Sequence, residues 1–208
     1  MRKLLVLIMS AFAIMIFGQT FEGKIIYQNS YESKIPNMSN EQLTSMMGSI
    51  QDYIIKEGNY KSSTNGSMMQ WQLYINNDNK LYSKMKNSDT IFWNDGATNT
   101  DEVLKTEVNK EVTEILGYKC DEIILTCKSG VQKYYFNSKV NVDAILFAKH
   151  LFGNWYDFIK ISQALPLKSI IESPQFILIS EAKEVKQMKF DDKEFQLPEN
   201  AKLMKSPY

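Results

Sequence analysis

The sequence predicts a protein of the α+β class, a mainly antiparallel β-sheet with two or three short helices. Two observations support this prediction. Short runs rich in β-branched and aromatic residues follow one another along most of the chain, separated by the Gly, Asn and Asp residues of tight hairpins. Apolar residues at helical spacing interrupt these runs in only a few places. The 208 residues suit one domain and are enough to bury a core without disulfides.

Residues 1–18 have the pattern of a secretory signal peptide. The basic pair Arg2 and Lys3 precedes the stretch 4–17, which is apolar or small apart from one serine. An uncleaved membrane anchor is the alternative, but a spanning helix needs about 20 apolar residues. We expect residues 19–208 to form a single mature domain in the periplasm or outside the cell, with no integral membrane span. Lipid attachment is disfavoured because no cysteine lies near the cleavage point.

A strand and a helix come first after this segment. Glu22–Tyr31 is rich in β-branched and aromatic residues, which predicts a strand. Ser39 and Gln42 then form a capping box, in which each side chain satisfies a free amide at a helix start. The sequence therefore predicts a helix from about residue 40 to residue 50. Its apolar face consists of Leu43, Met46, Met47 and Ile50.

Hairpins fill the middle of the chain. The predicted strands are 51–57, 60–64, 69–75, 80–86, 89–93, 120–127 and 131–136. Gly58 and Asn59 supply the positive φ angles that the first of these hairpins needs. Within 69–75, the side chains of Trp71, Leu73 and Ile75 share one face of the strand.

The C-terminal third combines helix and strand. Residues 142–153 predict a short helix, and the ambiguous stretch 154–162 can continue it. Strands are predicted at 165–172, 175–190 and 195–204. The run 175–190 is long for one strand, since strands usually have about 5–6 residues, so a curved or bulged strand is expected there.

Composition and motifs argue against several classes of function. The 24 basic and 24 acidic residues balance, whereas a nucleic-acid interface needs concentrated positive charge. The chain lacks the G-x-S-x-G, P-loop and H-E-x-x-H motifs, and any catalytic Ser-His or Cys-His unit would have to use its one histidine, His150. The adjacent acids Asp121-Glu122 and Asp191-Asp192 point to opposite faces of a strand and form no dyad. We expect no enzyme and no cofactor.

The two cysteines, Cys120 and Cys127, lie in one predicted strand. Seven residues of strand span about 23 Å, whereas a disulfide needs Cα atoms within about 7 Å. The spacing is not C-x-x-C, and a zinc site needs about four Cys or His ligands. Two unbonded, non-catalytic thiols on opposite faces of the strand are therefore expected.

The methionines leave three interpretations open. Five of them cluster in the first third of the mature chain: Met38, Met46, Met47, Met68 and Met69. Methionine packs cores, lines adaptable apolar ligand surfaces, and can bind Cu(I). Met46 and Met47 lie on the apolar face of the predicted helix, where packing explains them. Core packing is therefore expected first, a lipid-like ligand surface second, and a metal is not expected.

Short motifs resemble a known group of proteins. The stretch ILGYKCDEIIL, followed by a glycine and YYF, resembles the GYKC strand-and-hairpin segment of uncharacterised secreted bacterial proteins. These include a domain-of-unknown-function family and the GLPGLI-type proteins. EGKIIY near the start and LPLKSIIE and FQLP near the end extend the resemblance over roughly Glu22 to Pro198. That group is similar to the LolA/LolB lipoprotein carriers. The resemblance implies a half-barrel, a curved antiparallel sheet whose helices close a concave face that holds acyl chains.

The expected function follows from that concave face. A curved sheet cannot fill its own concavity, so helices must cover it, and a loose cover would leave an apolar pocket. We expect an exported protein that binds or carries a hydrophobic, lipid-like ligand. The candidate lining residues are Leu43, Met46, Met47, Ile50, Trp71, Phe147 and Trp155. The alternative is a non-enzymatic envelope interaction module with a solid core, whose partner is an envelope protein and which takes no small ligand.

Overall fold

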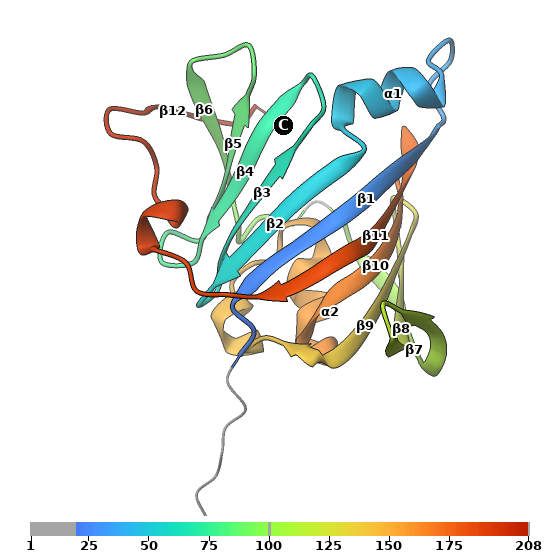
Figure 1. Cartoon of the computed structure of the whole chain (residues 1–208). Coiled ribbons are helices and arrows are strands. Elements are labelled where there is room, and N and C mark those ends of the chain that lie inside the picture. The colour runs from blue at the N-terminus through green and yellow to red at the C-terminus, as the bar shows by residue number, and fades with distance from the viewer. Residues whose placement is uncertain (1–19, 100, 208) are drawn as a thin grey trace, which may run out of the picture.

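The computed structural model describes residues 20–99 and 101–207, which form one large curved sheet (Figure 1). The predicted signal peptide lies outside the described residues. Across the sheet the strands follow the order β12-β6-β5-β4-β3-β2-β1-β11-β10-β9-β8-β7. Their bounds are β1 Gly23–Ser33, β2 Ile50–Lys56, β3 Asn59–Thr64, β4 Met69–Ile75, β5 Lys80–Met85, β6 Thr90–Asp95, β7 Val103–Ile115, β8 Tyr118–Cys127, β9 Val131–Asn141, β10 Ala164–Glu172, β11 Phe176–Gln187 and β12 Lys202–Lys205.

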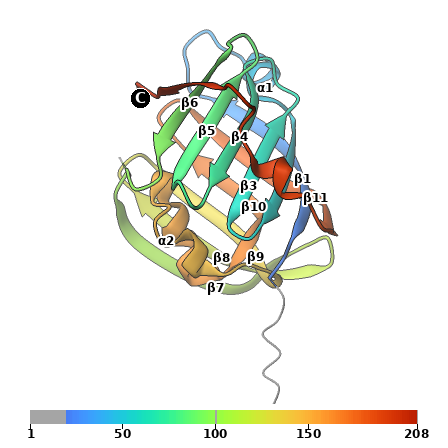
Figure 2. The same ribbon diagram turned by 90° about the vertical axis from the view of Figure 1, so that its left-hand side faces the viewer.

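Neighbouring strands pair antiparallel, as predicted, except at one edge. There β12 runs parallel to β6, with Lys202 opposite Thr90 and Lys205 opposite Trp93. The C-terminal segment reaches this edge by crossing β3 and β4, which its 3-10 turn contacts (Figure 2). The predicted strand 195–204 is therefore mostly connecting chain and ends in a short parallel strand.

β1 lies in the middle of the sheet between β2 and β11. Its buried residues alternate with less buried ones, so one face of the strand points into the core. The pairing of β1 with β11 is irregular next to Ile26 and Tyr27. The long strand expected at 175–190 is thus a bulged strand ending at Gln187, and such a bulge bends and twists the sheet.

Two α-helices and three 3-10 turns accompany the sheet. They are α1 Asn40–Met47, α2 Trp155–Ser162, η1 Ala144–Phe147, η2 Phe152–Asn154 and η3 Asp192–Phe195. The predicted capping box of Ser39 and Gln42 starts α1. This helix ends three residues before Ile50 because Gly48 adopts φ 99°, outside the helical region. The short helix expected at 142–153 is instead two 3-10 turns. None of the helices in the described part of the chain is long and apolar enough to cross a bilayer.

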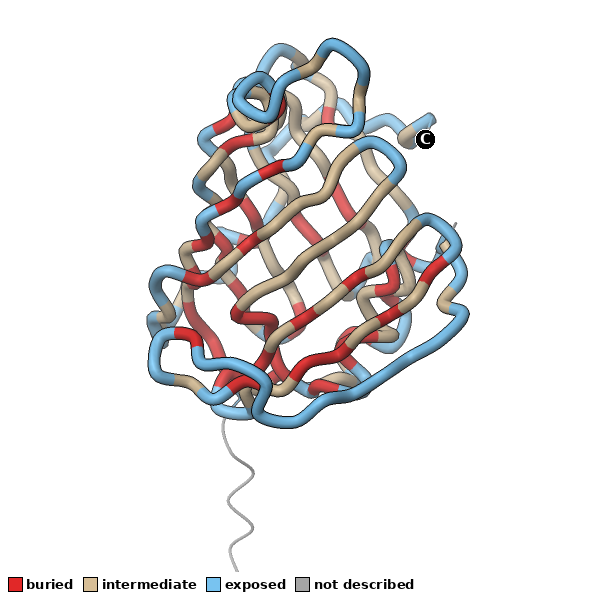
Figure 3. Tube along the Cα trace, turned by 90° about the vertical axis from the view of Figure 1, so that its right-hand side faces the viewer, coloured by how far each residue is buried: buried red, intermediate tan, exposed pale blue. Residues whose placement is uncertain are grey.

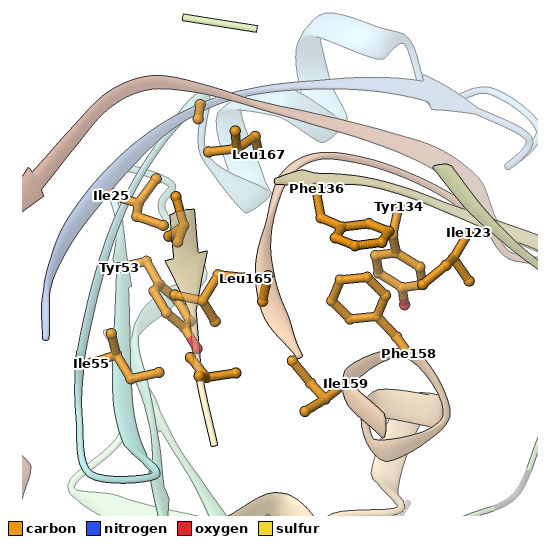
Figure 4. Packing of buried hydrophobic residues seen from close by; sticks show 14 of the residues in the cluster. Ile25, Tyr53, Ile55, Ile123, Tyr134, Phe136, Phe158, Ile159, Leu165 and Leu167 are labelled. Atoms are coloured by element: carbon orange, nitrogen blue, oxygen red, sulfur yellow. The ribbon is translucent and has the colours of Figure 1, made fainter. Parts of the chain in front are cut away.

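The two faces of the sheet bury separate hydrophobic clusters. Residues 143–163, here called the cover, lie on the concave face, and their Phe147, Phe158 and Ile159 are fully buried in the main cluster. Figure 4 shows Phe158 and Ile159 packed among the buried side chains of the strands. The second cluster gathers Leu73, Tyr82 and Ile91 under the η3 residue Phe195. Buried positions alternate with more exposed ones along many of the strands (Figure 3), as expected where one face of a strand packs into a cluster and the other is more open.

Candidate functional site

The structure does not bring the seven predicted ligand-lining residues together. They lie on α1 (Leu43, Met46 and Met47), at the start of β2 (Ile50), on β4 (Trp71) and on the cover (Phe147 and Trp155). Phe147 is a buried member of the main cluster and Trp155 packs against that cluster. The other five are outside it, so the concave face is lined largely by residues that the helical and strand patterns did not identify.

Helix α1 lies at the end of β1 and not over the main cluster (Figure 1). Leu43 is only 3% exposed but belongs to neither cluster. Met46 and Met47 are half-buried, and Ile50 is 47% exposed as the first residue of a strand. The structure therefore places the α1 face beside the end of β1, outside the main cluster. The helix is too short to carry Ile50 and contacts chiefly β1.

Trp71 lies on the face of the sheet opposite to the cover. Its neighbours in the second cluster include Leu73 and Ile75, whereas Tyr74 belongs to the main cluster. The predicted common face of Trp71, Leu73 and Ile75 is confirmed, but it packs under the C-terminal segment. Strand periodicity shows which side chains share a face and leaves open which face is concave.

A row of aromatic rings crosses the concave face beneath the cover. Tyr60 of β3 is the cross-strand partner of Tyr74 of β4, and their ring centroids are 5.3 Å apart. Tyr53 of β2 stacks on Tyr60, also at 5.3 Å. From the cover, His150 stacks on Tyr74 at 4.0 Å, and Trp155 lies 6.0 Å from Tyr60. These five residues are called the aromatic cluster.

Three polar atoms of the aromatic cluster are buried without a hydrogen-bond partner among the described residues. They are Tyr53 Oη, His150 Nδ1 and Trp155 Nε1. The other ring nitrogen of His150 pairs with Tyr60 Oη at 2.8 Å. Burial lowers the pKa of His150 to about 3, so the ring is neutral at ordinary pH. The larger hollows formed by the described residues are lined elsewhere, so this part of the concave face is filled by side chains.

The open part of the concave side lies beside the edge strand β7. A groove of about 850 Å³ runs between β7, β8, β9 and the C-terminal end of α2. Its apolar wall consists of Val108, Phe136, Val142 and Ile161. Phe136 and Val142 belong to the main cluster, while Val108 and Ile161 are 44% and 38% exposed. The wall therefore continues the core to the surface. This hollow is called the edge groove.

Charged side chains form the rim of the edge groove, namely Lys110, Glu111, Lys119, Asp121 and Lys139. Lys110 Nζ lies 2.7 Å from Asp121 Oδ2, and the Glu111 amide donates to Asp121 Oδ1 over 3.0 Å. Burial alone would raise the pKa of Asp121, but these two hydrogen bonds hold it below its ordinary value. Lys119 Nζ lies 3.8 Å from Glu111 Oε2. Across the described chain, no carboxylate lies within ion-pair distance of Lys139.

Cys120 and Cys127 are free and buried, and both belong to the main cluster. Both lie in the single strand β8, as predicted. The pairing of β7 with β8 is irregular between Asn109 and Thr113, the partner of Cys120, and the extra residues lie on β7. Burial raises the pKa of both thiols, that of Cys127 to about 11, which favours the unreactive protonated form. Within the described ranges, no three His, Cys, Asp or Glu side chains are placed to hold a metal ion.

Sequence reasoning assigns no role to residues 103–115, which form β7 and one wall of the edge groove. Most of β7 is exposed, so charged residues occupy positions that would be apolar in a half-buried strand. The alternation of apolar and polar residues that marks such a strand is therefore missing. The available signal is the density of Val and Thr in VLKTEVNKEVTEI, which is typical of β-structure.

Comparisons with known proteins do not assign the chain to a family. No family model and no curated protein matches it. The solved structures that are similar to it include three with low TM-scores. PNGF-II has a TM-score of 0.48 and 16% identity, covering 90% of this chain and 32% of that one. An uncharacterized conserved protein from Thermus thermophilus has a TM-score of 0.42 and 6% identity, with 87% and 90% covered.

The third similar structure is the LolA superfamily protein NE2245 from Nitrosomonas europaea. Its TM-score is 0.39 and its identity 9%, with 86% of this chain and 91% of that chain covered. The chain spans about a third of the length of PNGF-II and most of the length of the other two structures. Likenesses of this degree identify neither a family nor an activity.

Proposed function

We propose that the chain is an exported, non-enzymatic binding protein that takes a hydrophobic, lipid-like ligand into the edge groove. The observation that carries the proposal is the groove's apolar wall, which joins buried core residues to the exposed Val108 and Ile161. Ligand sites typically have volumes of about 300–1,000 Å³. The groove of about 850 Å³ is within that range, and its apolar wall is set among polar and charged lining residues. The proposed site replaces the α1 and Trp71 surfaces, which lie elsewhere.

The burial of apolar surface supplies the driving force. Val108 and Ile161 leave hydrocarbon in contact with water, and a ligand chain laid against them removes that contact. Each buried methylene group contributes about 0.8 kcal/mol, so a chain of moderate length can bind measurably to a preformed wall. The wall needs no opening of the cover, because Phe136 and Val142 already form its floor.

A matched pair of variants tests the proposal. Residues 19–208 are titrated with a fluorescent fatty-acid probe, and Ile161→Asp is compared with Leu203→Asp. Both side chains are exposed and apolar, but Leu203 lies on β12 at the other edge of the sheet. We expect Ile161→Asp to weaken probe binding about tenfold or more, because it places a charge against the ligand chain. Both melting temperatures should stay close to that of the wild type.

Two results would contradict the proposal. One is a wild-type protein that takes up no probe and whose melting temperature is unmoved by lipid extract. The other is equal probe binding by Ile161→Asp and Leu203→Asp, which would place the ligand outside the edge groove.

A second candidate is the envelope interaction module with a solid core. It is favoured by the filled concave face, where Phe147, Phe158 and Ile159 are completely buried against the sheet. Native mass spectrometry of the protein purified from its own envelope separates the two candidates. A co-purifying lipid supports the carrier, and a co-purifying protein supports the module.

A further inference from the structure

We infer that the ligand of the edge groove is an apolar chain ending in an anionic group, a carboxylate or a phosphate, and that Lys139 contacts this group. The inference rests on the proposed function and adds the chemical class of the ligand. It follows from how the charges of the groove rim are already paired within the protein.

Two of the three rim lysines are held by carboxylates. Lys110 forms a 2.7 Å ion pair with Asp121, and Lys119 lies 3.8 Å from Glu111. Asp121 also accepts the Glu111 amide, so both of its oxygens are engaged. Among the described residues, Lys139 is thus the rim cation that has no carboxylate partner. The three lysines and two acids leave the rim with a net positive charge.

The backbone that carries Lys139 is fixed to the neighbouring strand. Asn137 Nδ2 donates to the Lys119 carbonyl over 2.5 Å, and Asn137 Oδ1 accepts from the Lys139 amide over 3.0 Å. The single Asn137 side chain therefore ties the end of β9 to the β8 strand across the groove. Because these hydrogen bonds already fix the backbone at Lys139, less conformational entropy is lost when its side chain binds a ligand.

The rim and the wall together select an amphiphile. Val108 and Ile161 offer contact to hydrocarbon, while the unpaired ammonium of Lys139 offers an ion pair to an anion. Ser138 and Gln163 also line the groove and add neutral hydrogen-bonding groups beside it. A neutral head group cannot form an ion pair with the Lys139 ammonium, and a cationic head group is repelled by it. The geometry therefore favours an anionic head over a neutral head on the same chain.

Three probes of equal chain length test the inference, namely dodecanoate, dodecyl phosphate and dodecanol. Their affinities for residues 19–208 are measured by displacement of a fluorescent fatty-acid probe at low and high salt. In the wild type we expect both anions to bind up to about fivefold tighter than the alcohol, which is the range for an exposed ion pair. High salt should remove this preference because it screens exposed charges.

Charge variants of one position provide the control for chain binding. Lys139→Gln should abolish the preference for the anions, and Lys139→Glu should invert it, while dodecanol binds all three proteins equally. Lys86→Gln is the matched control, because Lys86 is exposed in the turn between β5 and β6 and does not line the groove. It should retain the wild-type preference.

The outcomes separate this inference from the function on which it rests. If all three probes bind but Lys139→Gln keeps the anion preference, or the wild type has none, the anionic head group is refuted and the apolar site survives. If only one of the two anions binds tighter than dodecanol, that anion identifies the head group. If no probe binds at all, both the inference and the proposed function fail.

Discussion

Tyr53, His150 and Trp155 each place an unpartnered polar atom in the aromatic cluster. A buried polar group without a hydrogen bond costs about 1–3 kcal/mol of stability, so three such groups in one cluster destabilise the folded state by several times that amount. The apolar contacts of the same rings offset it, since stacked aromatic pairs contribute about 0.5–1.5 kcal/mol beyond their buried area. In this cluster the ring contacts therefore stabilise the fold, while the polar atoms of the same side chains oppose it.

His150 makes the stability of the protein depend on pH. Its pKa is about 3 in the folded protein and about 6.5 in an unfolded chain. Protonation therefore favours the unfolded state, so the full stability is present above pH 6.5 and falls as the pH drops below that value. Between pH 7.5 and pH 5 we expect a loss of about 2 kcal/mol in the free energy of unfolding, measured by urea denaturation. His150→Gln should flatten this dependence, and an unchanged slope in that variant would assign it to other groups.

The same residue shows what sequence reasoning can assign. His150 is the one histidine of the chain, and because no partner motif accompanies it, the sequence gives it no catalytic role. Its position against Tyr74 could not be predicted, because Tyr74 lies far away in the sequence and the contact depends on how the cover folds back.

At the scale of elements, α1 is attached to the sheet mainly through one side chain. Leu43 is 3% exposed, whereas Met46 is only half-buried. We expect Leu43→Ala to lower the free energy of unfolding by about 2–4 kcal/mol and Met46→Ala by less than about 1 kcal/mol, as measured by urea denaturation. Met46→Asp should leave uptake of the fatty-acid probe intact, because α1 does not line the edge groove. Equal destabilisation by the two alanine variants would mean that Met46 is packed as deeply as Leu43.

Local elements were predictable where their signals are local. The capping box started α1 at the expected residue, and the Gly58 hairpin joins β2 to β3. The positive φ angles of this hairpin lie at Glu57 and Gly58, and not at Asn59 as predicted. The end of α1 and the 3-10 turns of the cover were missed because both depend on backbone geometry beyond apolar spacing. Gly48 ends the helix before its fourth apolar residue, and Gly153 and Asn154 are both left-handed and interrupt the cover.

For the whole molecule, the sheet order sets a gradient of local stability. β1 is paired on both sides near the middle of the sheet, whereas β12 is a four-residue edge strand whose residues are all exposed. In hydrogen-exchange experiments, amides in the centre of β1 should exchange at least about a thousandfold more slowly than those of β12, because central strands open only with global unfolding. Comparable exchange rates in the two strands would show that β12 belongs to the same cooperative unit as the centre.

The order of the sheet was not predictable from the sequence. Each hairpin brings together strands that are adjacent along the chain, so its turn residues reveal it. No turn joins β1 to β11 or β6 to β12, and these pairings are set by which apolar faces can be buried together. The curved antiparallel sheet was therefore predictable as a class, while the position of its open groove was not, because the groove depends on how α2 packs beside β7, β8 and β9, which no turn residue marks.

The position of β1 has a consequence for the way the chain is delivered. β1 emerges first from a ribosome or a translocation channel, yet Gly23 pairs with Gln187 and Ser33 with Phe176 near the other end of the chain. One whole edge of β1 must wait until nearly all of the polypeptide has emerged. Closing a loop of that length is slow, so the early segments remain extended in the meantime. A chain with this topology therefore keeps one edge of β1 unpaired, with its backbone N–H and C=O groups free, until β11 has been synthesised.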